Sequence, residues 1–272
     1  MMKCIRLVGL CFVSAFTIGA FAATGASADN PEYGRCVKEG MKEVSKYDTA
    51  KCIKLASEDP GTEEEKIKKG SYVWHPGPPA KAGFTMGLKP STIATLEYKS
   101  GSKMTCSGLS AVGEYTGIKT MSISQWIISG CETGGIKCNT PGAGTGVIEV
   151  KALEGELGVI KKAKPTTSDK IGNVLWPAGG TPLSESQWVE FACGGITEKV
   201  KNSVIAPVTQ NTMKLTATVK YTASKGEQDP ERFEGEPDMF LEIKYSAAPY
   251  EQWGWSMTTI VTNEETVEIR SL

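Results

Sequence analysis

The stretch Lys214-Leu215-Thr216-Ala217-Thr218-Val219-Lys220-Tyr221 decides the fold, because apolar and polar side chains alternate along it. Successive side chains of an extended strand point to opposite faces. The side chains that share the apolar face are Leu215, Ala217, Val219 and Tyr221. One face in the core and one in water is typical of antiparallel sheets, whereas buried parallel strands carry continuous apolar runs. The stretch therefore predicts an antiparallel strand, and 266–269 repeats its pattern.

Short β-rich runs of this kind follow one another from residue 71 onward, separated by clusters of Gly, Pro and Asn. The expected strands cover 71–75, 91–99, 102–107, 119–129, 146–153, 156–162, 187–193, 196–205, 212–223, 239–245, 255–262 and 265–270. No segment has a long helical period. Many short strands without intervening helices predict an all-β fold over 71–272, an antiparallel β-sandwich or barrel. Residues 29–70 are polar and irregular, and we expect a small disulfide-tied N-terminal segment there, with a short helix at 62–69.

The first 28 residues have the features of a secretory signal peptide. Lys3 and Arg6 form a basic start, an apolar run follows, and small residues end it at Ala26-Ser27-Ala28. The apolar run is shorter than the roughly 20 residues that a membrane-spanning helix needs. We therefore expect cleavage after Ala28 and a secreted or cell-surface protein without a transmembrane segment.

Six cysteines follow the predicted cleavage site: Cys36, Cys52, Cys106, Cys131, Cys138 and Cys193. Outside the cytosol an even number of cysteines favours disulfides. Zinc sites use pairs as close as C-x-x-C, and this spacing does not occur, so we expect no metal and no cofactor. Six cysteines allow many connectivities. Proximity in the chain favours Cys36–Cys52 and Cys131–Cys138, which leaves Cys106–Cys193.

The charge balance argues against nucleic acid as a partner. The formal net charge is −1, and the short basic run 66–69 directly follows three glutamates. Binding to a phosphate backbone needs clustered Lys and Arg.

Catalytic motifs are largely missing from the sequence. The only histidine, His75, precedes Pro76 at an expected strand end, and a Ser-His-Asp triad needs a histidine base. A glycoside hydrolase needs two carboxyl groups placed across a cleft. The acids near strand ends or turns are Glu154, Glu156, Glu190, Glu234, Glu236 and Asp238. The sequence does not show which of them could pair.

Trp253 and Trp255 are two residues apart, so in a strand they share one face, beside Tyr250. If exposed, the three rings would form a flat binding platform for sugar rings or for a partner protein. If buried, they are ordinary core, which is the commoner role of aromatic side chains.

Several short motifs resemble a family of uncharacterised secreted actinobacterial proteins. They are Pro31-Glu32-Tyr33-Gly34-Arg35-Cys36, Gly113-Glu114-Tyr115-Thr116-Gly117, Ser129-Gly130-Cys131-Glu132, Leu153-Glu154-Gly155-Glu156-Leu157-Gly158, Phe191-Ala192-Cys193-Gly194-Gly195, Ser203-Val204-Ile205-Ala206-Pro207-Val208, Phe233-Glu234-Gly235-Glu236-Pro237 and Thr262-Asn263-Glu264-Glu265. The resemblance spans nearly the whole chain after Ala28 and implies no activity.

Together these features predict a non-catalytic binding protein or envelope-associated β protein outside the cytosol. Its partner would be a cell-wall glycan or a surface protein. The alternative is a secreted glycoside hydrolase that uses a pair of carboxylates.

Overall fold

The computed structural model describes residues 31–39, 46–53, 70–163, 169–209 and 213–271. This part of the chain is all-β and contains no helix, so the predicted all-β antiparallel fold is confirmed. Accordingly, no helix long and apolar enough to cross a membrane occurs among these residues. The predicted signal peptide and the helix expected at 62–69 lie outside the described residues.

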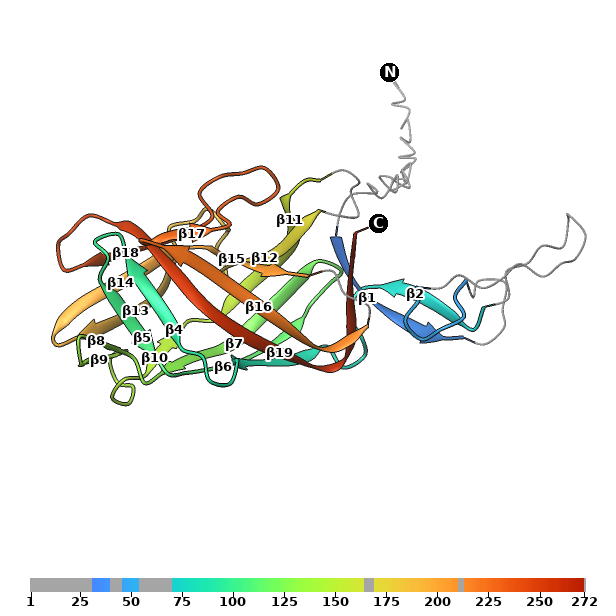
Figure 1. Cartoon of the computed structure of the whole chain (residues 1–272), viewed down its shortest axis with the longest axis horizontal. Helices are drawn as coiled ribbons and strands as arrows, with labels where there is room; N and C mark the ends of the chain where they lie inside the picture. Colours follow the sequence, from blue (N-terminus) through green and yellow to red (C-terminus); the bar gives the residue numbers. More distant parts are fainter. Residues whose placement is uncertain (1–30, 40–45, 54–69, 164–168, 210–212, 272) are drawn as a thin grey trace, which may run out of the picture.

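Eight strands form a closed antiparallel barrel, in which each strand is hydrogen-bonded to two neighbours (Figure 1). The order around the barrel is β4-β5-β8-β9-β13-β14-β18-β19 and back to β4. The bounds are β4 Ala94–Tyr98, β5 Lys103–Cys106, β8 Glu132–Thr133, β9 Ile136–Asn139, β13 Gln187–Cys193, β14 Ile196–Asn202, β18 Leu241–Tyr245 and β19 Glu251–Ser271. A barrel, not a sandwich, is therefore the architecture of this half.

Two disulfides lie where the barrel has its shortest ladders. The pairing of β5 with β8 consists of Thr105 opposite Glu132 alone, and Cys106 is bonded to Cys131 beside it. Between β9 and β13 the ladder has two residue pairs, one of which is Cys138 opposite Cys193, and these two form a disulfide. The bridges thus close the barrel covalently where hydrogen bonding is thinnest.

The predicted pairs Cys131–Cys138 and Cys106–Cys193 are therefore wrong, although all six cysteines are bonded as expected. Cys131 and Cys138 flank the β8–β9 hairpin, whose own ladder already joins them. Each bridge instead reaches the next strand around the barrel, and that neighbour is distant in sequence.

A second curved antiparallel sheet has the order β15-β12-β11-β7-β6-β3-β19-β16. Its further strands are β3 Gly83–Leu88, β6 Gly108–Tyr115, β7 Thr120–Ser129, β11 Leu153–Lys161, β12 Lys170–Pro177, β15 Val204–Val208 and β16 Lys214–Ser224. Two outer strands, β10 Ile148–Val150 and β17 Glu227–Asp229, pair with β7 and β16. The sheet curls so far that its edge strands β15 and β16 face each other.

The long strand β19 belongs to both halves and runs diagonally across the molecule (Figure 1). Trp253 pairs with Tyr98 of the barrel, and further along Val261 pairs with Met86 of the second sheet. Sequence analysis expected two shorter strands here, at 255–262 and 265–270. Because β19 is continuous, one hydrophobic core extends through both halves.

At the end of the molecule that carries the C-terminus, β1 (Pro31–Lys38) pairs with β2 (Tyr72–Pro76) and with the last residues of β19. The irregular structure expected for 29–70 is thus wrong for 31–38. Gly34 makes the close contact of β1 with β2 possible, because a Cβ at this position would clash with the indole of Trp74.

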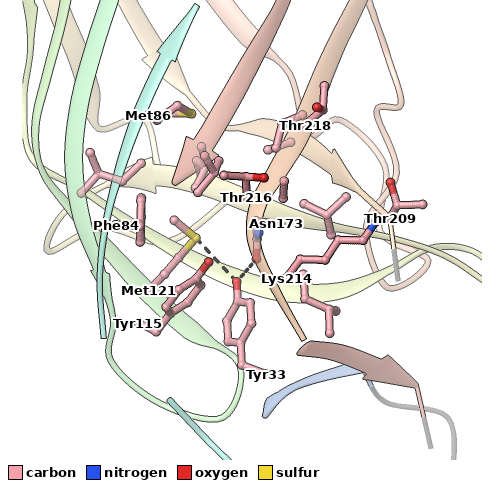
Figure 2. Close-up of a pocket in the computed structure, with 18 residues that line it drawn as sticks. Tyr33, Phe84, Met86, Tyr115, Met121, Asn173, Thr209, Lys214, Thr216 and Thr218 are labelled. Atoms are coloured by element: carbon pink, nitrogen blue, oxygen red, sulfur yellow. Dashed lines mark hydrogen bonds between the residues drawn. The ribbon is translucent and has the colours of Figure 1, made fainter. Parts of the chain in front are cut away.

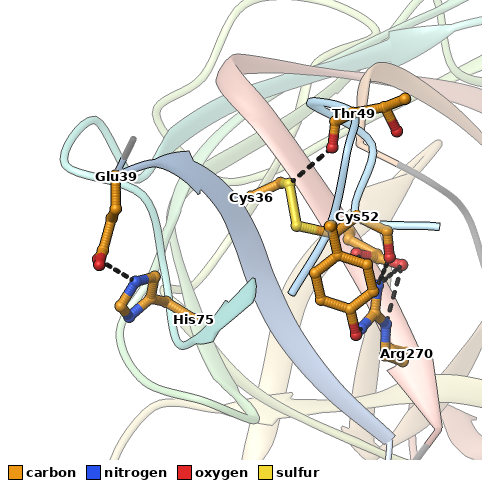
Figure 3. Close-up of a disulfide and its surroundings, with 8 residues drawn as sticks. Cys36, Glu39, Thr49, Cys52, His75 and Arg270 are labelled. Atoms are coloured by element: carbon orange, nitrogen blue, oxygen red, sulfur yellow. Dashed lines mark hydrogen bonds and ion pairs between the residues drawn. A yellow bond between two sulfur atoms is a disulfide. The ribbon is translucent and has the colours of Figure 1, made fainter. Parts of the chain in front are cut away.

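The predicted Cys36–Cys52 disulfide is confirmed, and it ties β1 to the loop that contains Cys52 (Figure 3). Arg270 of β19 holds the same loop. Its guanidinium donates to the carbonyl oxygen of Cys52 at 2.9 Å and to both carboxylate oxygens of Glu268 at 2.9 Å. The guanidinium also lies over the rings of Tyr47 and Trp74. The loop is therefore fixed to the C-terminal strand by a disulfide, hydrogen bonds and cation–π contacts.

Candidate functional site

The second sheet encloses a cavity of about 240 Å³. Side chains from β1, β3, β6, β7, β12, β15, β16 and β19 line it, so it lies inside the curl of the sheet (Figure 2). Its wall is mostly apolar and includes Phe84, Met86, Ile123 and Leu175. Concave, mostly apolar pockets with a few fixed polar groups are the usual form of small-molecule sites.

A hydrogen-bonded pair of polar side chains projects into this apolar space. The Tyr33 hydroxyl donates to Asn173 Oδ1 at 2.5 Å and lies 3.6 Å from Met121 Sδ. Since Oδ1 is used by Tyr33, the amide nitrogen Nδ2 of Asn173 is directed into the cavity (Figure 2). The pair thus offers a donor to whatever fills the space.

The backbone of three segments holds Tyr33 in place. Its N–H donates to the carbonyl of Ile118 at 2.8 Å, and its own carbonyl accepts from the N–H of Gly77 at 2.8 Å. In the ladder of β1 with β19 it lies opposite Ile269. The fully buried ring of Tyr33 therefore closes one end of the cavity as a fixed part of the fold.

Tyr115 is the second phenol in the wall. Its ring packs against those of Tyr33 and Phe84, with centroids 4.6 and 5.2 Å apart, and its hydroxyl donates to Asn263 Oδ1 at 2.9 Å. Burial raises the pKa of both phenols well above the ordinary value, and the proximity of Tyr115 adds to the effect on Tyr33. Both hydroxyls are therefore neutral donors at physiological pH.

The cavity opens to solvent between β15 and β16. Of the side chains that line it, the exposed ones lie at the end of β15 or on β16: Thr209, Lys214, Thr216 and Thr218. Val208 and Thr209 also line a larger groove on the outer surface, of about 940 Å³. Val208 and Thr209 thus line both the cavity and this groove.

The pattern in the stretch 214–221 is only partly fulfilled. Val219 and Tyr221 are buried as expected. Leu215, in contrast, is 47% exposed, because the ladder of β16 with β19 is irregular between Lys214 and Thr216, which interrupts the alternation at this residue.

The aromatic platform that the sequence offers as one interpretation of Trp253, Trp255 and Tyr250 is not present at the surface. Trp253 and Trp255 are buried in the core, where they pack with Trp126 and Trp188. Tyr250 is half-buried, and the ammonium groups of Lys201 and Lys244 lie over its ring. Of the two interpretations offered for this motif, the core role is the one that fits the tryptophans.

The structure does not gather the candidate acids in the cavity or in the outer groove. Glu154 and Glu156 are exposed on the outer face of β11. Glu190 forms an ion pair with Lys199, and Glu234 accepts a hydrogen bond from the backbone N–H of Val159. The lining of the cavity includes no His, Cys, Asp or Glu among the described residues. The ionisable side chains that do line the cavity are Tyr33, Tyr115 and Lys214.

His75 lies away from the cavity, on β2, and its Nε2 contacts Glu39 Oε1 at 2.8 Å (Figure 3). In the described part of the chain, no three His, Cys, Asp or Glu side chains are grouped as metal ligands.

Sequence reasoning missed Tyr33 and Asn173 as site residues. Tyr33 stands in a segment expected to be irregular, and the strand β12 was not expected at all. Asn173 is the one strongly polar side chain within the buried run Ile171–Trp176, which is the signal that could have indicated it.

Comparisons with known proteins leave the site to be interpreted from its own geometry. A scan of protein-family models, a search of curated proteins and a search of solved structures each found no match.

Proposed function

We propose that this chain is a non-catalytic binding protein that holds a small, mostly apolar molecule in the cavity of the second sheet. The supporting observation is an apolar cavity inside a strand framework, with a fixed Tyr33–Asn173 pair and an opening at β15 and β16. Its volume corresponds to about eight water molecules at the density of the liquid. A ligand of on the order of ten non-hydrogen atoms would fit.

The three disulfides indicate an oxidising environment. These bridges support the proposal that the protein acts outside the cytosol, as a secreted or cell-surface protein, which the N-terminal sequence also predicts. The burial of Trp253 and Trp255 removes the basis for stacking on a wall glycan, and for this reason we favour the cavity over the surface as the binding site.

Calorimetric titration with 1-octanol tests the proposal, because this probe matches the cavity in size and apolar character. The variant Ala206→Phe adds a ring to the cavity wall and should abolish binding. The variant Val112→Phe adds the same ring at a position that is 42% exposed, and should bind as wild type does.

Ala206→Phe could also lose binding because the larger side chain prevents folding. A variant that enlarges the cavity therefore provides a second test. Met86→Ala should shift the preference from octanol toward a longer alcohol, such as decanol. If wild type bound no alcohol, or if Ala206→Phe folded and bound octanol unchanged, the proposal would be wrong.

A further inference from the structure

The polar side chains that line the cavity are unbalanced in charge. Among the 18 described residues that line it, Lys214 is the only one that is charged at neutral pH, and none is a carboxylate. The described ion pairs of the protein use other lysines, namely Lys103, Lys137, Lys199 and Lys201. The cavity therefore carries a positive charge without a counter-charge in its wall.

Lys214 stands at the opening and not in the depth of the cavity. It is the first residue of β16, its side chain is exposed, and the exposed Thr209, which follows β15, lines the same opening. Asn263 Nδ2 donates to its backbone carbonyl at 3.3 Å, which fixes this end of the strand. The charge is thus held where a ligand would enter, while it keeps contact with water.

One further polar group in the wall favours an acceptor over a donor. The amide Nδ2 of Asn173 points into the space (Figure 2), whereas the exposed Thr216 and Thr218 on β16 carry hydroxyls that can donate or accept. Deeper in, the wall is formed by side chains such as Met86, Ile123 and Leu175. The arrangement is asymmetric: a cation stands at the mouth, whereas the interior is apolar except for the Tyr33–Asn173 pair.

We propose that the ligand is a medium-chain carboxylate, with its apolar chain in the cavity and its carboxylate at the mouth beside Lys214. This inference rests on the proposed function and specifies the ligand class. A charge-assisted hydrogen bond between ammonium and carboxylate is stronger than a neutral one, and an exposed pair weakens with salt.

Three probes with the same eight-carbon alkyl chain separate the contribution of the head-group charge from that of the apolar contact. They are octanoate, 1-octanol and octylammonium, titrated at neutral pH and low ionic strength. We expect octanoate to bind about three- to tenfold more tightly than octanol, and octylammonium to bind more weakly than both. The preference for octanoate should shrink as salt is added.

The variant Lys214→Gln should remove the preference for octanoate and leave octanol binding unchanged. Lys220→Gln is the matched control, because Lys220 is on the same strand and lines the outer groove but not the cavity. It should keep the preference.

The outcomes distinguish the two proposals. If octanol bound but octanoate bound no more tightly, or if Lys214→Gln kept the preference, the ligand class would be wrong and the binding function would stand. If none of the three probes bound, the binding function itself would fail.

Discussion

The hydroxyl of Tyr33 donates to Asn173 Oδ1 across 140 residues of sequence, at a distance of 2.5 Å inside the cavity. This bond joins the first described strand, β1, to β12 of the second sheet. It links the N-terminal end of the fold to the site, so a change at Tyr33 affects both stability and the cavity.

Tyr33→Phe tests this link. The substitution removes the donor and leaves the buried Asn173 carbonyl oxygen without its partner, which should lower the free energy of unfolding by about 1–2 kcal/mol. Denaturant titration measures the change. Tyr245→Phe, at a side chain that is 42% exposed, should change the free energy of unfolding by less than about 0.5 kcal/mol. Equal stability of Tyr33→Phe and wild type would contradict the assigned bond.

The disulfides that close the barrel give a second prediction. Peptide mapping of unreduced protein should recover Cys106 linked to Cys131 and Cys138 linked to Cys193. The chain-entropy model assigns about 4 kcal/mol to a bridge across a separation of 55 residues, as between Cys138 and Cys193. The double variant Cys138→Ser/Cys193→Ser should lose stability of this order. A peptide that linked Cys131 to Cys138 would refute the barrel closure described above.

Arg270 should contribute far more to the free energy of unfolding than the exposed Arg232 does. Arg270→Ala leaves the Glu268 carboxylate, which is nearly fully buried, without its partner, and should cost about 3 kcal/mol of unfolding free energy. Arg270→Lys keeps a charge but loses the two-pronged contact with Glu268, so its cost should be smaller. Thermal unfolding measures both, with the exposed Arg232→Ala as a near-neutral control. If Arg270→Ala lost no more stability than Arg232→Ala, the contacts of Arg270 with Glu268 and Cys52 would contribute nothing to stability.

Glu198 gives a prediction with a defined sign in pH. Burial raises the pKa of its carboxyl, and the hydrogen bond from the Tyr98 hydroxyl partly offsets this effect. A raised pKa means that the folded state binds the proton more tightly than the unfolded state does. The stability that Glu198 contributes is fully present below the pKa of its carboxyl in the unfolded state, and it is lost as the pH rises through the pKa in the folded state.

Glu198→Gln keeps an acceptor for Tyr98 and cannot ionise. Relative to wild type, its denaturation midpoint should therefore increase as the pH is raised from 4 to 8, in denaturant titrations across this range. Glu156→Gln, at an exposed position, should follow wild type throughout. A relative midpoint for Glu198→Gln that fell with pH would contradict the assignment.

The sequence predicts the strands better than the connections between them. Alternation at 214–221 and 187–193 indicates antiparallel strands because it depends only on local geometry. The pairing of Cys138 with Cys193 depends on which strands become neighbours around a closed barrel, which spacing along the chain does not encode.

The candidate site could not be predicted from the sequence because it, too, depends on contacts between distant segments. Tyr33 and Asn173 are 140 residues apart and become a pair only when β1 packs against the second sheet. Trp253 and Trp255 were conspicuous, yet the face they share is the inner one. The tryptophans identify the core here, whereas the polar atoms of Tyr33 and Asn173 mark the cavity.

The methionine side chains allow the central claim to be tested directly. Met86 and Met121 line the cavity, whereas Met104 and Met257 are buried in the core outside its lining. In protein labelled at the methionine methyl groups, titration with octanol should shift the NMR signals of Met86 and Met121 and leave those of Met104 and Met257 in place. Uniform shifts of all four signals, or none at saturating octanol, would contradict a ligand site inside the second sheet.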